Sequence, residues 1–142
     1  MDKALTKIVI GLVAFAASGM ACAQTCWEQA SARYGVNPHI LVAIAKHESG
    51  LNPGAVRRNN DGTMDRGIMQ INSIHLPELR RYGITERHLL DPCVNVHIGA
   101  WLLSRHIARF GNTWQAVGAY HSKTPSLNRA YALRIWRKLV AG

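Results

Sequence analysis

Glu48 is the residue of this 142-residue chain whose type and position could most directly do chemistry. Asn37-Pro38 is a typical helix start and Gly50 a typical helix end, so we predict a helix between them. A spacing of four residues places Glu48 on the same core-facing stripe as Ile40 and Ile44. Burial and the negative end of the helix dipole both disfavour a carboxylate, so the pKa of Glu48 should be raised. A carboxylic acid that stays protonated near neutral pH can act as a general acid.

The alternative for Glu48 is an ordinary solvated or salt-bridged residue at a helix end. A zinc-protease helix is not indicated, because H-E-x-x-H would need a histidine at position 51, which is Leu51. We therefore expect no metal and no organic cofactor.

Apolar spacing and turn residues around Glu48 predict a mainly α protein with a single domain. The segment after it, 51–63, is rich in Asn, Gly and Pro, and we expect it to be irregular, with a hairpin-like excursion as the alternative. We find no strand-like alternation longer than a few residues. The helices that we expect span 25–34, 37–49, 73–81, 93–110, 114–120 and 127–140.

The N-terminus has the pattern of a secretory signal peptide. Lys3 and Lys7 precede a short apolar run, and Ala21-Cys22-Ala23 fits the small-x-small cleavage rule. We expect residues 1–23 to be removed after Ala23, leaving a domain of residues 24–142 that is periplasmic or secreted. An uncleaved membrane anchor is the alternative.

Two cysteines, Cys26 and Cys93, remain after that cleavage. An even pair in an exported chain predicts a disulfide, and two buried free thiols are the alternative. The whole chain carries a formal charge of +9, and loss of Lys3, Lys7 and Asp2 would leave +8. In an exported protein this charge favours an anionic envelope polymer over nucleic acid as partner. Because the basic residues are scattered, a merely solvated surface is also possible.

Three motifs occur in order: A-I-A-K-H-E-S-G-L-N-P (43–53), G-I-M-Q-I-N (67–72) and G-A-Y-H-S (118–122). In these the chain resembles the lytic transglycosylases of the lysozyme superfamily, over about residues 24–135. Cys26 with L-x-D-P-C (89–93), the compact size and the lack of a wall-binding module look most like the small specialised members. Those accompany secretion systems, conjugation machines and pili.

The resemblance implies a lysozyme-like helical domain that cleaves peptidoglycan between N-acetylmuramic acid and N-acetylglucosamine. Cleavage would be non-hydrolytic and leave 1,6-anhydromuramic acid ends. Glu48 would be the catalytic acid/base, Ser49 would support it, and Tyr120 would lie near the carboxylate and orient it. The loop expected to line the saccharide groove contributes Gly67, Met69, Gln70 and Asn72. Core positions are the alternative for Met69 and Tyr120.

Two positions depart from the family pattern. His121-Ser122 stands where most relatives have Asn-Ala, which affects the groove contacts next to Tyr120. Asp65 stands where many relatives have a small residue, and the sequence offers no physical account of it.

Two other functions stay open. A hydrolytic muramidase would use Asp61 or Asp65 to position a water. A cationic, non-catalytic wall-binding protein would recruit an assembly apparatus without cutting. In every case we expect a monomer whose partner is peptidoglycan, with components of a secretion or conjugation machine as further partners and no nucleic acid.

Overall fold

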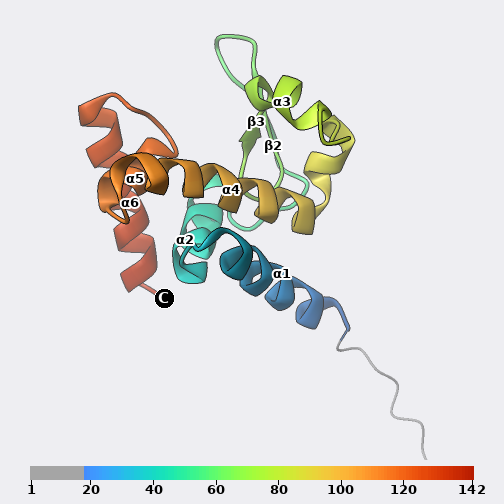
Figure 1. Cartoon of the computed structure of the whole chain (residues 1–142), viewed down its shortest axis with the longest axis horizontal. Coiled ribbons are helices and arrows are strands. Elements are labelled where there is room, and N and C mark those ends of the chain that lie inside the picture. Colours follow the sequence, from blue (N-terminus) through green and yellow to red (C-terminus); the bar gives the residue numbers. More distant parts are fainter. Residues whose placement is uncertain (1–17) are drawn as a thin grey trace, which may run out of the picture.

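The computed structural model describes residues 18–142, and their side chains from Thr25 onward, so the predicted signal peptide lies largely outside the described residues (Figure 1). The prediction of a mainly α domain is confirmed. In chain order the elements are α1 (Ser18–Tyr34), α2 (Pro38–Ser49), β1 (Val56–Arg58), β2 (Met64–Arg66), β3 (Ile71–Asn72), the 3-10 turn η1 (Ser73–His75), α3 (Leu76–Arg80), the 3-10 turn η2 (Glu86–Leu90), α4 (Pro92–Phe110), α5 (Trp114–Ala119) and α6 (Pro125–Val140).

Helix α4 crosses the middle of the molecule, and the other elements are arranged around it (Figure 1). α1 and α5 pack against α4, and α6 packs against both α2 and α5. In the view of Figure 1, the labelled strands and α3 lie above α4, whereas α6 lies at the left. The end of α2, which carries Glu48, is hydrogen-bonded both to α6 and to the loop before β3.

Local capping explains the helix ends that the sequence predicts. The Asn37 side chain accepts a hydrogen bond from the His39 N–H at 2.8 Å, and Gly50 closes α2 with a φ of 64°. Asp91 caps α4 in the same way, at 2.9 Å from the Val94 N–H. Two starts differ from the prediction. α1 begins at Ser18 rather than Thr25, because most of residues 20–24 are good helix formers. α6 begins at Pro125, a favoured first-turn residue.

The segment 51–63 is not wholly irregular: it contains β1 and the turn of a hairpin, which is the alternative named for it. β1 pairs antiparallel with β2, and β2 pairs antiparallel with β3. The Asn59 N–H donates to the Thr63 carbonyl at 2.9 Å and closes the hairpin, and Asp61 accepts from the Thr63 N–H within the turn. Strands of three residues are too short to show alternation, which is why the sequence pattern does not reveal them.

The predicted disulfide is confirmed and joins two helices that also pack together. Cys26 of α1 bonds to Cys93 in the first turn of α4, with their Cα atoms 5.4 Å apart and a sequence separation of 67. Closing a loop of that length stabilises the folded chain by about 4 kcal/mol in the chain-entropy model. The bond fixes α1 beside the helix on which the rest of the core packs.

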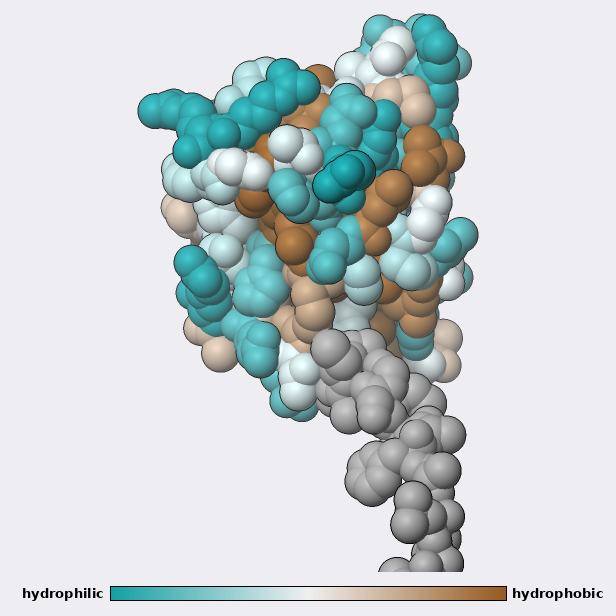
Figure 2. Space-filling model, turned by 90° about the vertical axis from the view of Figure 1, so that its right-hand side faces the viewer, coloured by the Kyte–Doolittle hydropathy of each residue, from teal (hydrophilic) through white to brown (hydrophobic). Residues whose placement is uncertain are grey.

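An apolar hollow opens on the face shown in Figure 2, where hydrophobic residues gather between hydrophilic ones. The cavity measures about 670 Å³, lies between α1, α3 and α4, and is lined by residues that include Tyr34, Leu79, Ile84, Val94 and Trp101. Glu48 is not part of it. Within residues 18–142, no helix has the length and apolar character that crossing a membrane requires.

Candidate active site

Glu48 lies in the last turn of α2 and receives its hydrogen bond from α6. The Tyr131 hydroxyl donates to Glu48 Oε1 at 2.6 Å. Tyr131 is fully buried, and burial together with the neighbouring Glu48 raises its pKa, so the phenol keeps its proton and acts as the donor. Among the described residues, no hydrogen bond reaches Glu48 Oε2. One carboxyl oxygen is therefore held, and the other is free to carry and deliver a proton.

The predicted rise in the pKa of Glu48 is confirmed. Burial is the largest cause, and the Asp65 carboxylate adds to it. The hydrogen bond from Tyr131 and the charge of Arg57 act in the opposite direction without cancelling the rise. A raised pKa is the direction of shift that a general acid requires.

Two histidines hold the Tyr131 ring. His121 stacks on it with ring centroids 5.0 Å apart and an interplanar angle of 6°. His47 meets it edge-on, with centroids 5.3 Å apart and an angle of 79°. His121, which departs from the family pattern, thus supports the ring that binds Glu48. Sequence reasoning did not identify Tyr131, since nothing local shows that it faces a residue 83 positions earlier.

Ser49 connects the end of α2 to the loop before β3. Its hydroxyl donates to the Ile68 carbonyl at 2.6 Å and accepts from the Asn52 N–H at 3.1 Å. The serine beside Glu48 therefore fixes the helix end against the predicted groove loop.

The loop of Gly67 and Met69 is held from inside the protein. Gly67 has a φ of 82°, and an added Cβ would overlap the Leu89 carbonyl and the Asn95 side chain, so only glycine fits. Buried Asn95 accepts from the Met69 N–H at 2.8 Å and donates to the Leu89 carbonyl at 2.7 Å. The Met69 side chain is fully buried against Gly99, which makes it a core residue.

The amide side chains of Gln70 and Asn72 form bonds within the protein. Gln70, which has a φ of 53°, donates to the carbonyls of Gly67 at 3.0 Å and Ala55 at 3.2 Å. Asn72 donates to Asp65 at 2.8 Å and caps η1 by accepting from the Ile74 N–H. Both residues shape the loop, and their contact with saccharide stays a prediction.

Tyr120 also bonds to this loop rather than to Glu48. Its hydroxyl donates to the Met69 carbonyl at 3.0 Å, and burial raises its pKa. Glu48 contributes to that rise, so the two side chains are near each other. The direct contact with the carboxylate is made by Tyr131.

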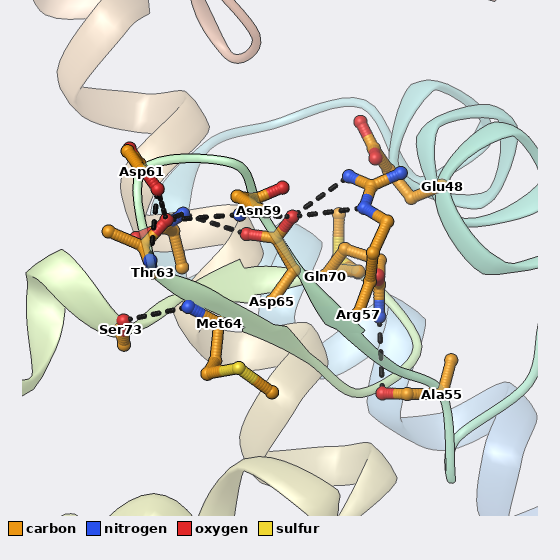
Figure 3. Close-up of polar contacts among 12 residues, drawn as sticks. Glu48, Ala55, Arg57, Asn59, Asp61, Thr63, Met64, Asp65, Gln70 and Ser73 are labelled. Carbon is orange, nitrogen blue, oxygen red and sulfur yellow. Dashed lines mark hydrogen bonds and ion pairs between the residues drawn. The ribbon is translucent and has the colours of Figure 1, made fainter.

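The sheet explains the presence of Asp65, for which the sequence offers no physical account. It pairs with Arg57 across β1 and with Asn72 across β3, and it accepts hydrogen bonds from both side chains at 2.8 Å. Asn59 Nδ2 adds a bond at 3.0 Å. Figure 3 shows the Arg57 guanidinium between the carboxylates of Asp65 and Glu48. This buried acid therefore ties the three strands together and carries its own counter-ion.

Asp61 is farther out, at the tip of the hairpin. It is exposed, and hydrogen bonds from the Thr63 hydroxyl and N–H lower its pKa. Within the described part of the chain, no group of His, Cys, Asp and Glu side chains is arranged to hold a metal ion.

Residues 25–138 match the family model described as the transglycosylase SLT domain. The chain belongs to this family. The transglycosylase is 43% identical over 116 residues to invasion protein IagB of Salmonella typhimurium, covering 78% of this chain and 72% of that one. It is 42% identical over 118 residues to protein IpgF of Shigella flexneri, covering 80% and 78%.

A solved structure shares the fold of the transglycosylase. It is an inactive Glu-to-Gln mutant of the lytic transglycosylase Slt from Pseudomonas aeruginosa, matched with a TM-score of 0.68 at 21% identity. The match covers 83% of this chain and 23% of that much longer one, so it shows the lysozyme-like fold alone.

Family membership makes this chain a peptidoglycan lytic transglycosylase related to IagB and IpgF. A disulfide together with a domain that acts on the cell wall indicates that the protein works outside the cytoplasm.

Proposed function

We propose that the transglycosylase cuts the bond between N-acetylmuramic acid and N-acetylglucosamine with Glu48 as its only acid/base. This proposal rests on the difference between two carboxyl groups of the site, those of Glu48 and Asp65. Glu48 has a raised pKa and a free oxygen, whereas the oxygens of Asp65 accept bonds from Arg57, Asn59 and Asn72. A hydrolase needs a second carboxylate to serve a water or to act as nucleophile, but a transglycosylase does not.

The reaction proceeds in two steps. Protonated Glu48 gives its proton to the glycosidic oxygen as the bond to the anomeric carbon of the muramic acid breaks, and the N-acetyl group assists as internal nucleophile. The Glu48 carboxylate then removes the proton from the muramic acid 6-hydroxyl, whose oxygen closes on the anomeric carbon. The product is a 1,6-anhydro ring, Glu48 regains its proton, and no water is consumed.

The test is mass spectrometry of the muropeptides released from purified peptidoglycan by protein that begins at Gln24, the predicted mature N-terminus. We expect products one water lighter than hydrolytic ones. Glu48→Gln should lower their rate of formation by about 10²- to 10⁴-fold, the usual contribution of a general acid. A Glu48→Gln protein that folds normally and keeps most of its activity would refute the assignment.

A muramidase using Asp65 is the second candidate, and the influence of Asp65 on the pKa of Glu48 is what favours it. It predicts reducing-end products and an Asp65→Asn variant as inactive as Glu48→Gln. In the single-acid mechanism, Asp65→Asn instead loosens the sheet and lowers the melting temperature, while the anhydro products persist.

The cellular role we assign is local opening of the wall during assembly of a secretion, conjugation or pilus apparatus. The similarity to the invasion protein IagB supports it. The predicted export signal, cleaved after Ala23, would deliver the protein to the periplasm. Chromosomal Glu48→Gln should reduce the number of assembled machines per cell. An unchanged number would favour a non-catalytic wall-binding role.

A further inference from the structure

Helix α6 presents two cations on the side from which Tyr131 reaches Glu48. Arg134 and Lys138 follow Tyr131 by three and seven residues, so all three lie on one face of the helix. Tyr131 is buried, whereas Arg134 and Lys138 are exposed. Because α6 packs beside α2, this face borders the helix end that carries the catalytic carboxyl group (Figure 1).

The positive charge of this α6 cation pair has no ion-pair partner in the part of the chain that the structure describes. None of the ion pairs among the described residues includes Arg134 or Lys138. The titratable groups that act on His47 are Arg134, Lys138, His121 and Arg57, all of them basic.

Basic groups also predominate around His121, which stacks on the Tyr131 ring. The groups that act on it are Arg134, Arg57 and Asp65, and Asp65 is already bonded to Arg57. Burial is the main cause that lowers the pKa of both histidines, and Arg134 is the next, so the imidazoles are neutral near pH 7. They offer hydrogen bonds there without adding charge.

Like charges gathered without a counter-ion repel one another, and a bound anion removes that repulsion. In peptidoglycan, a short peptide with free carboxylates extends from the lactyl group of the muramic acid, the sugar whose bond is cut. Arg and Lys are the side chains that bind carboxylates. We propose that Arg134 and Lys138, with His47 and His121 beside them, form a subsite for the carboxylates of this peptide stem. The inference rests on the function proposed above.

The experiment compares two substrates that differ only in charge. Soluble glycan strands with native stems are assayed beside the same strands whose stem carboxylates have been converted to amides. The wild-type protein should cleave the native strands with a kcat/KM roughly five- to tenfold higher, the effect of two partly exposed ion pairs, mainly through a lower KM.

Variants then assign this preference to residues. In Arg134→Ala/Lys138→Ala the two substrates should become equivalent, whereas Arg134→Lys/Lys138→Arg should retain most of the preference. Arg129→Ala/Arg137→Ala is the matched control, because it removes the same charge from exposed positions of α6 that do not act on His47 or His121. This control should keep the full preference. A wild type without preference, or a preference that survives Arg134→Ala/Lys138→Ala, overturns the subsite.

A binding experiment distinguishes failure of the subsite proposal from failure of the catalytic proposal. Fluorescence anisotropy with a labelled disaccharide-peptide is measured on the Glu48→Gln protein, with and without Arg134→Ala/Lys138→Ala. If the wild type cuts neither substrate, the catalytic proposal fails. Weaker binding of the native but not the amidated ligand on loss of the two cations still supports the subsite. Equal binding refutes it.

Discussion

Tyr131→Phe tests how the hydrogen bond to Glu48 serves the reaction. The substitution removes one oxygen and keeps the ring, so the packing against His47 and His121 is preserved. The lost contact is the 2.6 Å bond from the hydroxyl to Glu48 Oε1. This bond favours the charged form of Glu48, which arises once the proton has been given to the leaving group.

The expected loss of kcat follows from the strength of the hydrogen bond between Tyr131 and Glu48. A hydrogen bond to a charged group contributes about 1.5–3 kcal/mol, and since water can reach the half-buried Glu48 we take about 1–2 kcal/mol. That free energy corresponds to roughly a 5- to 30-fold loss of kcat. Because the bond lowers the pKa of Glu48, its removal raises that pKa further, and the falling limb of the pH–rate profile should move to higher pH.

The assay is the initial rate of anhydro-muropeptide release between pH 4 and 9 for the wild type, Tyr131→Phe and Tyr120→Phe. Tyr120→Phe is the matched control, because its hydroxyl bonds to the Met69 carbonyl and not to Glu48. It should leave the position of the falling limb unchanged. An unchanged limb in Tyr131→Phe, or a limb that moves to lower pH, would refute the reasoning.

Three further predictions concern stability. Glu48 has a pKa raised in the folded state, so its contribution is complete below the unfolded pKa and is lost as pH rises through the folded one. The melting temperature of Glu48→Gln should therefore rise relative to that of the wild type between pH 4 and pH 8. A difference that stays constant with pH would contradict this. Cys26→Ala/Cys93→Ala should lower the free energy of unfolding by about 4 kcal/mol in urea titrations, and a change below about 1 kcal/mol would contradict the loop-closure argument. Gly67→Ala should lower the free energy of unfolding by more than about 3 kcal/mol, because its Cβ would overlap Leu89 and Asn95. Gly62→Ala has a similar φ of 85° but lies in open space, so it should lower that free energy by only about 1–2 kcal/mol. Equal losses would show that the overlap at Gly67 is relieved.

The sequence predicts those parts of the fold that are determined locally. Asn37, Gly50 and Asp91 each act within a few residues of where they stand, so the ends of α2 and the start of α4 follow from residue type. The hairpin depends on pairing between strands of three residues, and so short a segment carries no period of its own.

The candidate site shows the same difference between features determined locally and contacts between distant segments. The place of Glu48 on a helix stripe and the raised pKa follow from spacing, but Tyr131 reaches it from 83 residues away. The amides of Gln70 and Asn72 have the chemistry to meet sugars, and the protein nevertheless uses them to hold its own loop and sheet. Residue type indicates what a side chain can bind, whereas its partner depends on how distant segments are brought together.

The electrostatics of the site follow from the way in which Arg57 is bound. Arg57 and Asp65 form an ion pair and act on the pKa of Glu48 in opposite directions. Burial is the largest influence, and the net effect is a raised pKa for Glu48. Arg134 and Lys138 act on His47 but are not among the groups that shift Glu48. The domain can therefore hold the positive charge of Arg134 and Lys138 beside this site without reversing the rise in the pKa of Glu48.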